Sequence, residues 1–279
     1  MPESNPSEFD LSRPAPVDSE SGTLHIDHGG FLAYRRRVAS RQERAHAESA
    51  TPTIVFPTIV FLGGFKSDMT GGKATALDTF CYARNLNYLR FDYSGHGVSS
   101  GDFLEGSITR WTADALAVID KLTTGPLILI GSSMGGWIML LAALQRRARV
   151  AGLIGIAAAP DFTEALIWQS LSADERRRLM SEGRLEQPSE YSDAPYVITR
   201  KLIEDGRSHL LLGRPIALDC KVRLLHGMRD SDVPHAFSLQ LAQNLDSADV
   251  AVTLIKDGDH RLSRPQDLLR LCEAVDELI

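Results

Sequence analysis

The sequence predicts an α/β protein, with a mostly parallel, twisted β-sheet and helices packed on both of its faces. Three observations lead to this fold class. Short apolar stretches alternate along the chain with amphipathic helical ones, as they do in β-α-β units. One apolar stretch, residues 127–130, ends in a sharp turn that is followed by a helix-forming run up to Leu144. That turn has G-x-S-x-G spacing and is centred on Ser133.

Composition narrows the class of protein. With 279 residues, 43% of them hydrophobic, the chain is long enough for one large domain, which we place at residues 21–279. Residues 1–20 are rich in proline, serine and acidic side chains, and we expect a disordered tail. A net charge of −6 argues against a nucleic-acid partner, and no apolar run approaches the ~18 residues of a membrane span. The three cysteines, which lack metal or redox spacing, are expected to be small buried hydrophobes in a reducing compartment: Cys81, Cys220 and Cys272.

The first half of the chain supplies a hairpin and then the α/β pattern. Residues 23–27 and 31–34 alternate on either side of a His-Gly-Gly turn, which is typical of a β-hairpin. The polar stretch 40–51 is interpreted as a surface excursion. Proline cannot donate to a central ladder, so the strand next to Pro57 should begin at Thr58. The expected strands are 58–62, 88–91, 127–130 and 150–156, and the expected helices are 74–85 and 107–122.

Residues 161–218 interrupt this rhythm. No strand-like run is evident there, and Ser172 with Glu175 forms a capping box that begins a helix. A short helix should precede it, and a third is expected over 196–211. We therefore predict a helical insertion that caps the site. The α/β pattern then resumes with expected strands 221–227 and 250–255 and expected helices 236–244 and 265–278.

The turn around Ser133 has the features of a nucleophile elbow. A serine at the tip of a tight strand-to-helix turn adopts a strained backbone and is crowded from both sides. Gly131 and Gly135, two residues before and after the serine, have no side chain and so relieve this crowding. The backbone N–H of Met134 then points to where an oxyanion would form. Ser132 is the competing serine, although its place beside the glycine favours a strand end.

A serine hydroxyl needs a base, and the base needs an orienting acid. In this architecture the chain order is nucleophile, acid, base. Asp230 follows the strand 221–227 most closely and is the favoured acid, with Asp232 as its rival. His260 is the only histidine beyond His235, and it lies in a turn after the last expected strand, so it is the favoured base. His96 and His226 also lie at strand ends, where we expect them to stabilise loops.

Other parts of the site follow from the same layout. The Gly-Gly-Phe loop after Leu62 should supply a second oxyanion donor, the backbone N–H of Phe65. Apolar residues at the start of the insertion could line an acyl pocket, or could equally pack the cap against the core: Phe162, Leu166, Ile167 and Trp168. No metal-ligand cluster and no G-x-G-x-x-G fingerprint occurs, so we expect neither a metal nor a cofactor.

With these residues in place, the chain resembles the alpha/beta-hydrolase superfamily. Within it, the chain is similar to the branch of acyl-protein (palmitoyl-protein) thioesterases that also act as mycophenolic acid acyl-glucuronide esterases. The likeness runs from about Thr58 to the C-terminus and rests on residues 67–69 with 72–74, 90–95, 131–137, 223–228 and 259–261. The resemblance implies the alpha/beta-hydrolase fold and a triad of Ser133, Asp230 and His260. The organelle-targeting segment of the animal members has no counterpart here, so we expect a cytoplasmic protein.

The predicted function is that of a serine hydrolase. It would cleave carboxylic esters or thioesters through an acyl-enzyme, as a carboxylesterase or thioesterase does. The substrate would be a small ester or thioester, or an acylated protein. The alternative is a binding or receptor protein that keeps the hydrolase fold and turns over slowly or once.

Overall fold

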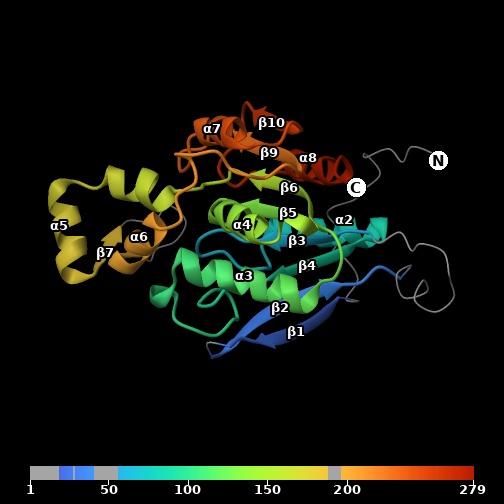
Figure 1. Cartoon of the computed structure of the whole chain (residues 1–279), viewed down its shortest axis with the longest axis horizontal. Helices are drawn as coiled ribbons and strands as arrows, with labels where there is room; N and C mark the ends of the chain where they lie inside the picture. The colour runs from blue at the N-terminus through green and yellow to red at the C-terminus, as the bar shows by residue number, and fades with distance from the viewer. Residues whose placement is uncertain (1–18, 28, 41–55, 188–195) are drawn as a thin grey trace.

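The computed structural model describes residues 19–27, 29–40, 56–187 and 196–279 (Figure 1). Within them, eight strands form the central sheet in the order β1-β2-β4-β3-β5-β6-β9-β10. In this sheet β4, β3, β5, β6, β9 and β10 are parallel to one another, while β2 pairs antiparallel with β4 and with β1. The strands are β1 (Glu20–His25), β2 (Phe31–Arg37), β3 (Thr58–Leu62), β4 (Asn87–Phe91), β5 (Leu127–Ser132), β6 (Val150–Ile156), β9 (Lys221–Gly227) and β10 (Val250–Ile255). The predicted fold class and the predicted hairpin are both confirmed.

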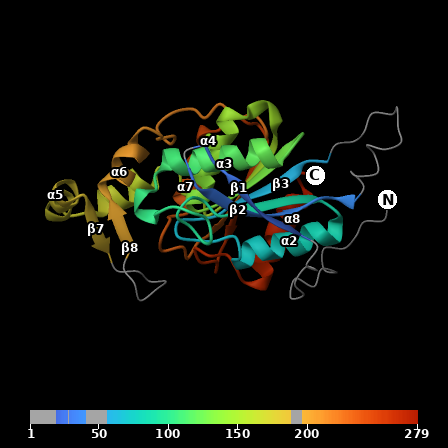
Figure 2. The same ribbon diagram turned by 90° about the horizontal axis from the view of Figure 1, so that it is seen from below.

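Helices cover both faces of the sheet, as Figure 2 shows from below. Apolar side chains of α2 (Gly72–Arg84) and α8 (Pro265–Asp276) pack on one face. The other face is covered by α3 (Ile108–Leu122), α4 (Met134–Gln145) and α7 (Ala236–Asn244). Two short 3₁₀ turns, Phe103–Glu105 and Arg147–Arg149, complete the body. In the described part of the chain, none of the helices has both the length and the apolar character that crossing a bilayer requires.

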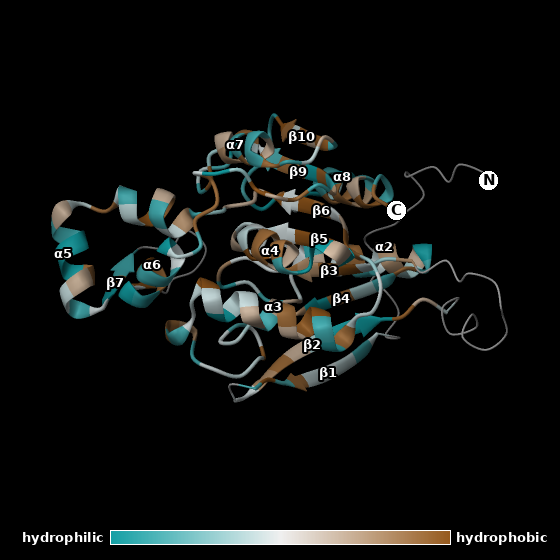
Figure 3. Cartoon of the chain, viewed as in Figure 1, coloured by the Kyte–Doolittle hydropathy of each residue, from teal (hydrophilic) through white to brown (hydrophobic). Residues whose placement is uncertain are grey.

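The central strands form because their residues are apolar without interruption. Leu127, Ile128, Leu129 and Ile130 of β5 are all fully buried, since helices cover both sides of a parallel sheet. Figure 3 shows hydrophobic residues gathered along β3 and α4, in contrast to the largely hydrophilic α5 (Ala173–Glu182) of the insertion. Strand β3 begins at Thr58, directly after Pro57, as predicted.

The described residues 161–187 and 196–207 belong to the insertion, which projects beyond the carboxyl ends of the strands at the left of Figure 1. Its described elements are a π-helical turn (Thr163–Ile167), a 3₁₀ turn (Trp168–Ser170), α5, β7 (Arg184–Gln187), β8 (Tyr196–Thr199) and α6 (Arg200–Arg207). Strands β7 and β8 pair antiparallel, so the prediction of a purely helical insertion was wrong. The third expected helix is confined to α6, because residues 196–199 are strand.

The insertion has a small hydrophobic core of its own, and two hydrogen bonds connect the two ends of the insertion at its base. Five buried residues form that core: Leu171, Leu179, Leu185, Ile198 and Ile203. At the base, the buried Asp161 carboxylate accepts the backbone N–H groups of Leu211 and Leu212, each at 2.8 Å. This carboxylate therefore ties the first residue of the insertion to the segment that returns to the body.

Two regions discussed from the sequence lie wholly or largely outside the described residues. The expected disordered tail, 1–20, is described only at residues 19 and 20, and 20 belongs to β1. Most of the expected surface excursion, 40–51, is also outside them.

Candidate active site

The turn between β5 and α4 holds Ser133 in a conformation that side-chain-bearing residues rarely adopt, with φ of 53° and ψ of −120°. The chain on both sides leaves no room for a side chain. A Cβ on Gly131 would lie 2.4 Å from the carbonyl oxygen of Gly135, and one on Gly135 would lie 2.1 Å from that of Leu62. The two glycines of the G-x-S-x-G pattern are therefore required by backbone packing around the serine.

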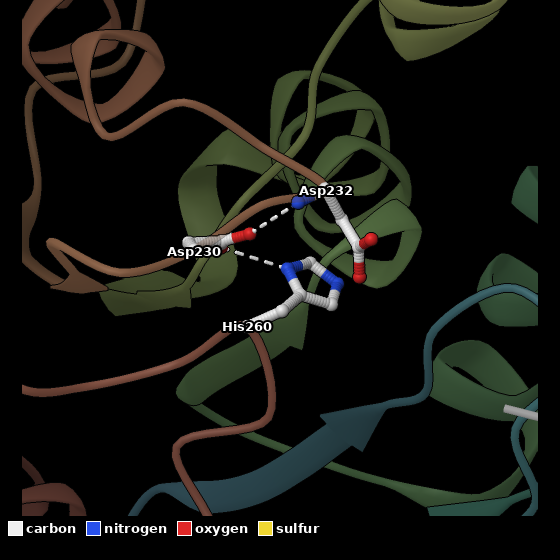
Figure 4. Close-up of side chains that lie close together, drawn as sticks. All are labelled: Asp230, Asp232 and His260. Atoms are coloured by element: carbon white, nitrogen blue, oxygen red, sulfur yellow. Dashed lines mark hydrogen bonds and ion pairs between the residues drawn. The ribbon is translucent and has the colours of Figure 1, made fainter. Parts of the chain in front are cut away.

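Three side chains from separate strand ends form one hydrogen-bonded chain. Nε2 of His260 lies 3.1 Å from Oγ of Ser133, and Nδ1 of the same ring lies 2.8 Å from Oδ2 of Asp230. Figure 4 shows the imidazole turned toward the Asp230 carboxylate. A carboxylate only accepts, so Nδ1 carries the ring proton and Nε2 can accept the serine hydroxyl.

The Asp230 carboxylate is fully buried and heavily hydrogen-bonded. Its Oδ1 accepts the backbone N–H groups of Asp232 and Val233, at 2.9 and 2.8 Å. Burial alone would raise the pKa of Asp230, but the hydrogen bonds from His226, His260 and Val233 outweigh burial and hold that pKa well below its usual range. The group is thus a stable anion facing the imidazole. Asp232, its rival in the sequence, lines the cavity instead.

His226 lies beneath this carboxylate and is completely buried. Its Nε2 is 3.2 Å from Oδ2 of Asp230 and 2.9 Å from the carbonyl oxygen of Val233. Its Nδ1 is 2.7 Å from Oγ of Ser238 in α7. Both neighbours of Nε2 are acceptors, so this nitrogen carries a proton and donates. His226 thus fixes the loop that carries Asp230, in agreement with the expectation that it stabilises a loop.

The loop after β3 borders the same cavity as Ser133. Phe65 and Met134 both line the cavity that contains Ser133. No acceptor for the Phe65 N–H lies among the described residues. The next residue, Lys66, has a positive φ of 57° and donates its N–H to Nε2 of His96 at 3.2 Å. Burial lowers the pKa of His96 to about 4, so the ring is neutral at neutral pH and remains able to accept.

A cavity of about 470 Å³ lies over the serine, between the sheet and the insertion. Phe162, Leu166 and Ile167 line it, as does Ile198 of β8. Trp168, which we had grouped with them, does not. Its ring is contacted by the guanidinium groups of Arg176 and Arg207, 5.2 and 4.5 Å from the ring centroid.

Residues of β8 were missed as lining residues for a simple reason. Tyr196 and Ile198 both reach the cavity, and they belong to the stretch that the sequence had suggested as helix. The β-branched and aromatic run Tyr-Val-Ile-Thr was the available signal for a strand.

Asp230, Asp232 and His260 bring possible metal-ligand atoms within 4.8 Å of one another. Because of the hydrogen bonds already described, these three residues are a poor fit for a metal ion. One oxygen of Asp230 accepts two N–H groups, and the other faces two imidazoles. A cation bound through Nδ1 of His260 would have to displace the proton on that nitrogen.

The fold and this geometry define an alpha/beta hydrolase, and the comparison with protein families agrees. The model of the alpha/beta hydrolase family matches residues 59–271, and the chain belongs to that family. The palmitoyl-protein thioesterase ABHD10, mitochondrial, of Rattus norvegicus is 42% identical over 226 residues, 80% of this chain and 75% of the relative. The Homo sapiens protein of the same name is 41% identical over 224 residues, 80% of this chain and 73% of its own length.

Two solved structures of similar sequence also have the fold of this chain. A hydrolase from Agrobacterium vitis S4 superposes with a TM-score of 0.85 and 41% identity, covering 95% of this chain and all of its own. The alpha/beta hydrolase domain-containing protein 10 from mouse has a TM-score of 0.80 and 37% identity, with 93% and 98% covered. The expectation of an enzyme of the carboxylesterase or thioesterase type is confirmed.

One expectation is corrected by these comparisons. We expected a cytoplasmic protein, but the relatives at 41–42% identity are named as mitochondrial proteins. That finding overturns the cytoplasmic expectation. The expectation rested only on finding no counterpart of the targeting segment of the animal members, and targeting segments are recognised by composition rather than by likeness to a relative.

Proposed function

We propose that this chain hydrolyses carboxylic thioesters and esters through a Ser133–His260–Asp230 triad and an acyl-enzyme intermediate. The observation that carries the proposal is the unbroken hydrogen-bonded chain from the Ser133 hydroxyl through His260 to the buried Asp230 carboxylate. A serine on a strained turn, a base with its free nitrogen toward that serine, and a permanently ionised acid are the three groups that acyl transfer requires.

The reaction follows from the positions of these groups. Oγ of Ser133 attacks the acyl carbon while Nε2 of His260 takes the hydroxyl proton. The Asp230 carboxylate stabilises the imidazolium that forms, and the N–H groups of Phe65 and Met134 stabilise the oxyanion. Nε2 then gives the proton to the leaving thiol or alcohol as the bond to the acyl carbon breaks. Water, deprotonated by the same nitrogen, attacks the acyl-enzyme, releases the acid and restores the serine.

We further propose an acylated protein or a small acyl thioester as the substrate. The relatives are named palmitoyl-protein thioesterases, and the cavity here has an apolar side formed by Phe162, Leu166 and Ile167. A volume of about 470 Å³ is within the usual range for sites that bury a small organic ligand. Acyl-glucuronide esters are the second substrate class, which the family resemblance suggests.

The test is steady-state hydrolysis of matched acyl thioesters and acyl oxyesters, with short and long chains, by wild type and Ser133→Ala. We expect multiple turnovers, with the highest kcat/KM for long-chain thioesters. Ser133→Ala should fold normally and lose activity by a factor on the order of 10⁶. Ser132→Ala serves as the control and should keep most of the activity. Activity that survives in Ser133→Ala would reject the nucleophile, and a single turnover would favour a receptor.

A further inference from the structure

A second cavity, of about 360 Å³, opens beside the candidate active site. It shares lining residues with the cavity over Ser133, among them Ser132, Lys73 and Arg261. The two cavities therefore meet next to the proposed nucleophile. A ligand could occupy both at once, with its middle beside the Ser133 hydroxyl.

The cap gives the first cavity an apolar side that the second cavity lacks. Phe162, Leu166 and Ile167 make the cap side of the first cavity apolar. Three cationic side chains, Lys66, Lys73 and Arg261, line both cavities, and the second cavity adds one acidic residue, Asp68. The carboxylate of Asp68 accepts the backbone N–H and the hydroxyl of Thr70 within its own turn. The described lining of the second cavity thus carries net positive charge.

Lys73 is the cation whose position is best defined. It lies in the first turn of α2, and its ammonium donates to the backbone carbonyl oxygen of Arg261, directly after His260. Among the described residues, no carboxylate lies within ion-pair distance of Lys73. Burial lowers the pKa of Lys73 to about 8, so the group is still mostly protonated at neutral pH. Lys73 is half-buried, and the carboxylates of Asp259 and Asp267 act on it only from a distance, so an anionic ligand in the cavity would add a direct partner for its charge.

Lys66 holds the second charge at the boundary between the cavities. Its ammonium lies 5.5 Å from the ring centroid of Phe103 and 4.8 Å from that of Tyr196. These cation–π contacts keep the charge beside the oxyanion loop, to which Lys66 itself belongs.

We propose that the second cavity is the leaving-group subsite of this enzyme, and that it favours leaving groups carrying a carboxylate or a phosphate. The inference rests on the proposed function and deepens it. The acyl chain takes the apolar cavity under the cap, so the thiol or alcohol side of the ester extends past Ser133 into the cationic cavity. The positive charge there binds an anion a few bonds from the scissile carbonyl.

The experiment compares three thioesters that share one acyl chain. Their leaving groups are N-acetylcysteamine, which is neutral, 3-mercaptopropionate, which adds a carboxylate, and coenzyme A, which adds phosphates. We expect wild type to have a kcat/KM for the anionic thioesters that exceeds the neutral one by about tenfold or more. A preference for both anionic thiols assigns a general anion site, and a preference for coenzyme A alone assigns the phosphate.

The variants identify the residue responsible. Lys73→Met should lower the anionic-to-neutral ratio by about tenfold, and Lys73→Arg should recover much of it. Lys221→Met, at the opposite end of β9 from the site, is the matched charge control and should leave the ratio unchanged. A ratio near one in wild type would overturn the subsite. An equal loss on all three thioesters in Lys73→Met would also overturn it, because Lys73 would then act only by holding the Arg261 carbonyl.

The result also separates the subsite from the proposed function. Turnover of the neutral thioester that depends on Ser133 supports the function whatever the ratio is. If no thioester is turned over, the proposed function fails, and calorimetry with the three free thiols decides the subsite. Tighter binding of the anionic thiols that is lost in Lys73→Met would support it, and equal binding of all three would refute it.

Discussion

The buried, neutral His96 should make the stability of the protein depend on pH in a way that one substitution removes. His96 is only 3% exposed, and its ring is surrounded by the rings of Tyr93, Phe103 and Trp111. Its Nδ1 faces the carbonyl oxygen of Ser94, and its Nε2 accepts from the N–H of Lys66. His96→Gln keeps a side-chain acceptor for the oxyanion loop but cannot take up a proton in this range.

The sign and the size of this pH dependence follow from the lowered pKa of His96. Burial lowers the pKa of His96 from 6.5 to about 4, so between these values the unfolded chain binds a proton that the folded protein does not. Stability from this group is therefore complete above about pH 6.5 and falls as the pH drops toward 4. Between pH 7 and pH 5, the free energy of unfolding of wild type should fall by about 2 kcal/mol from this residue alone.

Urea denaturation at pH 7 and pH 5 measures this difference directly. We expect the loss between the two pH values to be about 2 kcal/mol smaller in His96→Gln than in wild type. His25→Gln, at an exposed position on β1, should behave as wild type does. If wild type and His96→Gln lose the same stability between pH 7 and 5, then His96 is not the buried neutral group inferred from its contacts.

Three further substitutions probe the elbow, the acid and the core. Gly135→Ala should lower kcat on the order of 100-fold. The added Cβ would meet the carbonyl oxygen of Leu62 and displace Ser133. Gly213→Ala is the control, because a Cβ at Gly213 would lie in open space. Asp230→Asn should lower kcat by about 10³–10⁴-fold at unchanged fold, since an amide cannot hold the proton on Nδ1 of His260; a loss below tenfold would count against the triad. Asp78→Ala should reduce the free energy of unfolding, measured by urea denaturation, by about 3–5 kcal/mol. The reason is that the Asp78 carboxylate contacts the buried guanidinium groups of Arg37 and Arg90. A change below about 1 kcal/mol would argue against this pairing.

Much of the fold was accessible from the sequence because the parallel strands are buried on both sides. Such strands are continuous apolar runs, and β3, β6 and β9 begin and end at the predicted residues. The edge strand β10, which is only partly buried, also has the predicted bounds. The site residues were accessible for a related reason. Parallel strands place their carboxyl ends at one edge, so Ser133, Asp230 and His260 could be expected near one another although they are far apart in the chain.

The insertion was harder to predict because its signals are weak and non-local. Strand β7 has the sequence Arg-Leu-Glu-Gln, with a single apolar residue, and becomes a strand only by pairing with β8. Trp168 was grouped with the acyl pocket from its type and spacing, but its place is decided by contacts with Arg176 and Arg207, which come later in the chain. The contacts of His226 with Asp230 and Ser238 likewise depend on the folded loop.

Phe65 links the body of the protein to the insertion. Its backbone N–H is the proposed oxyanion donor, while its ring packs edge-on against Phe103 and Trp111 of the body, with centroids 4.9 and 5.9 Å away. The same ring lies 6.0 Å from Phe162 and 6.1 Å from Tyr196, both from the insertion. Because one side chain is held from both sides, an acyl chain that moves the insertion would also move the oxyanion donor. If Phe65 donates to the oxyanion as proposed, we expect changes in the insertion to alter kcat as well as KM.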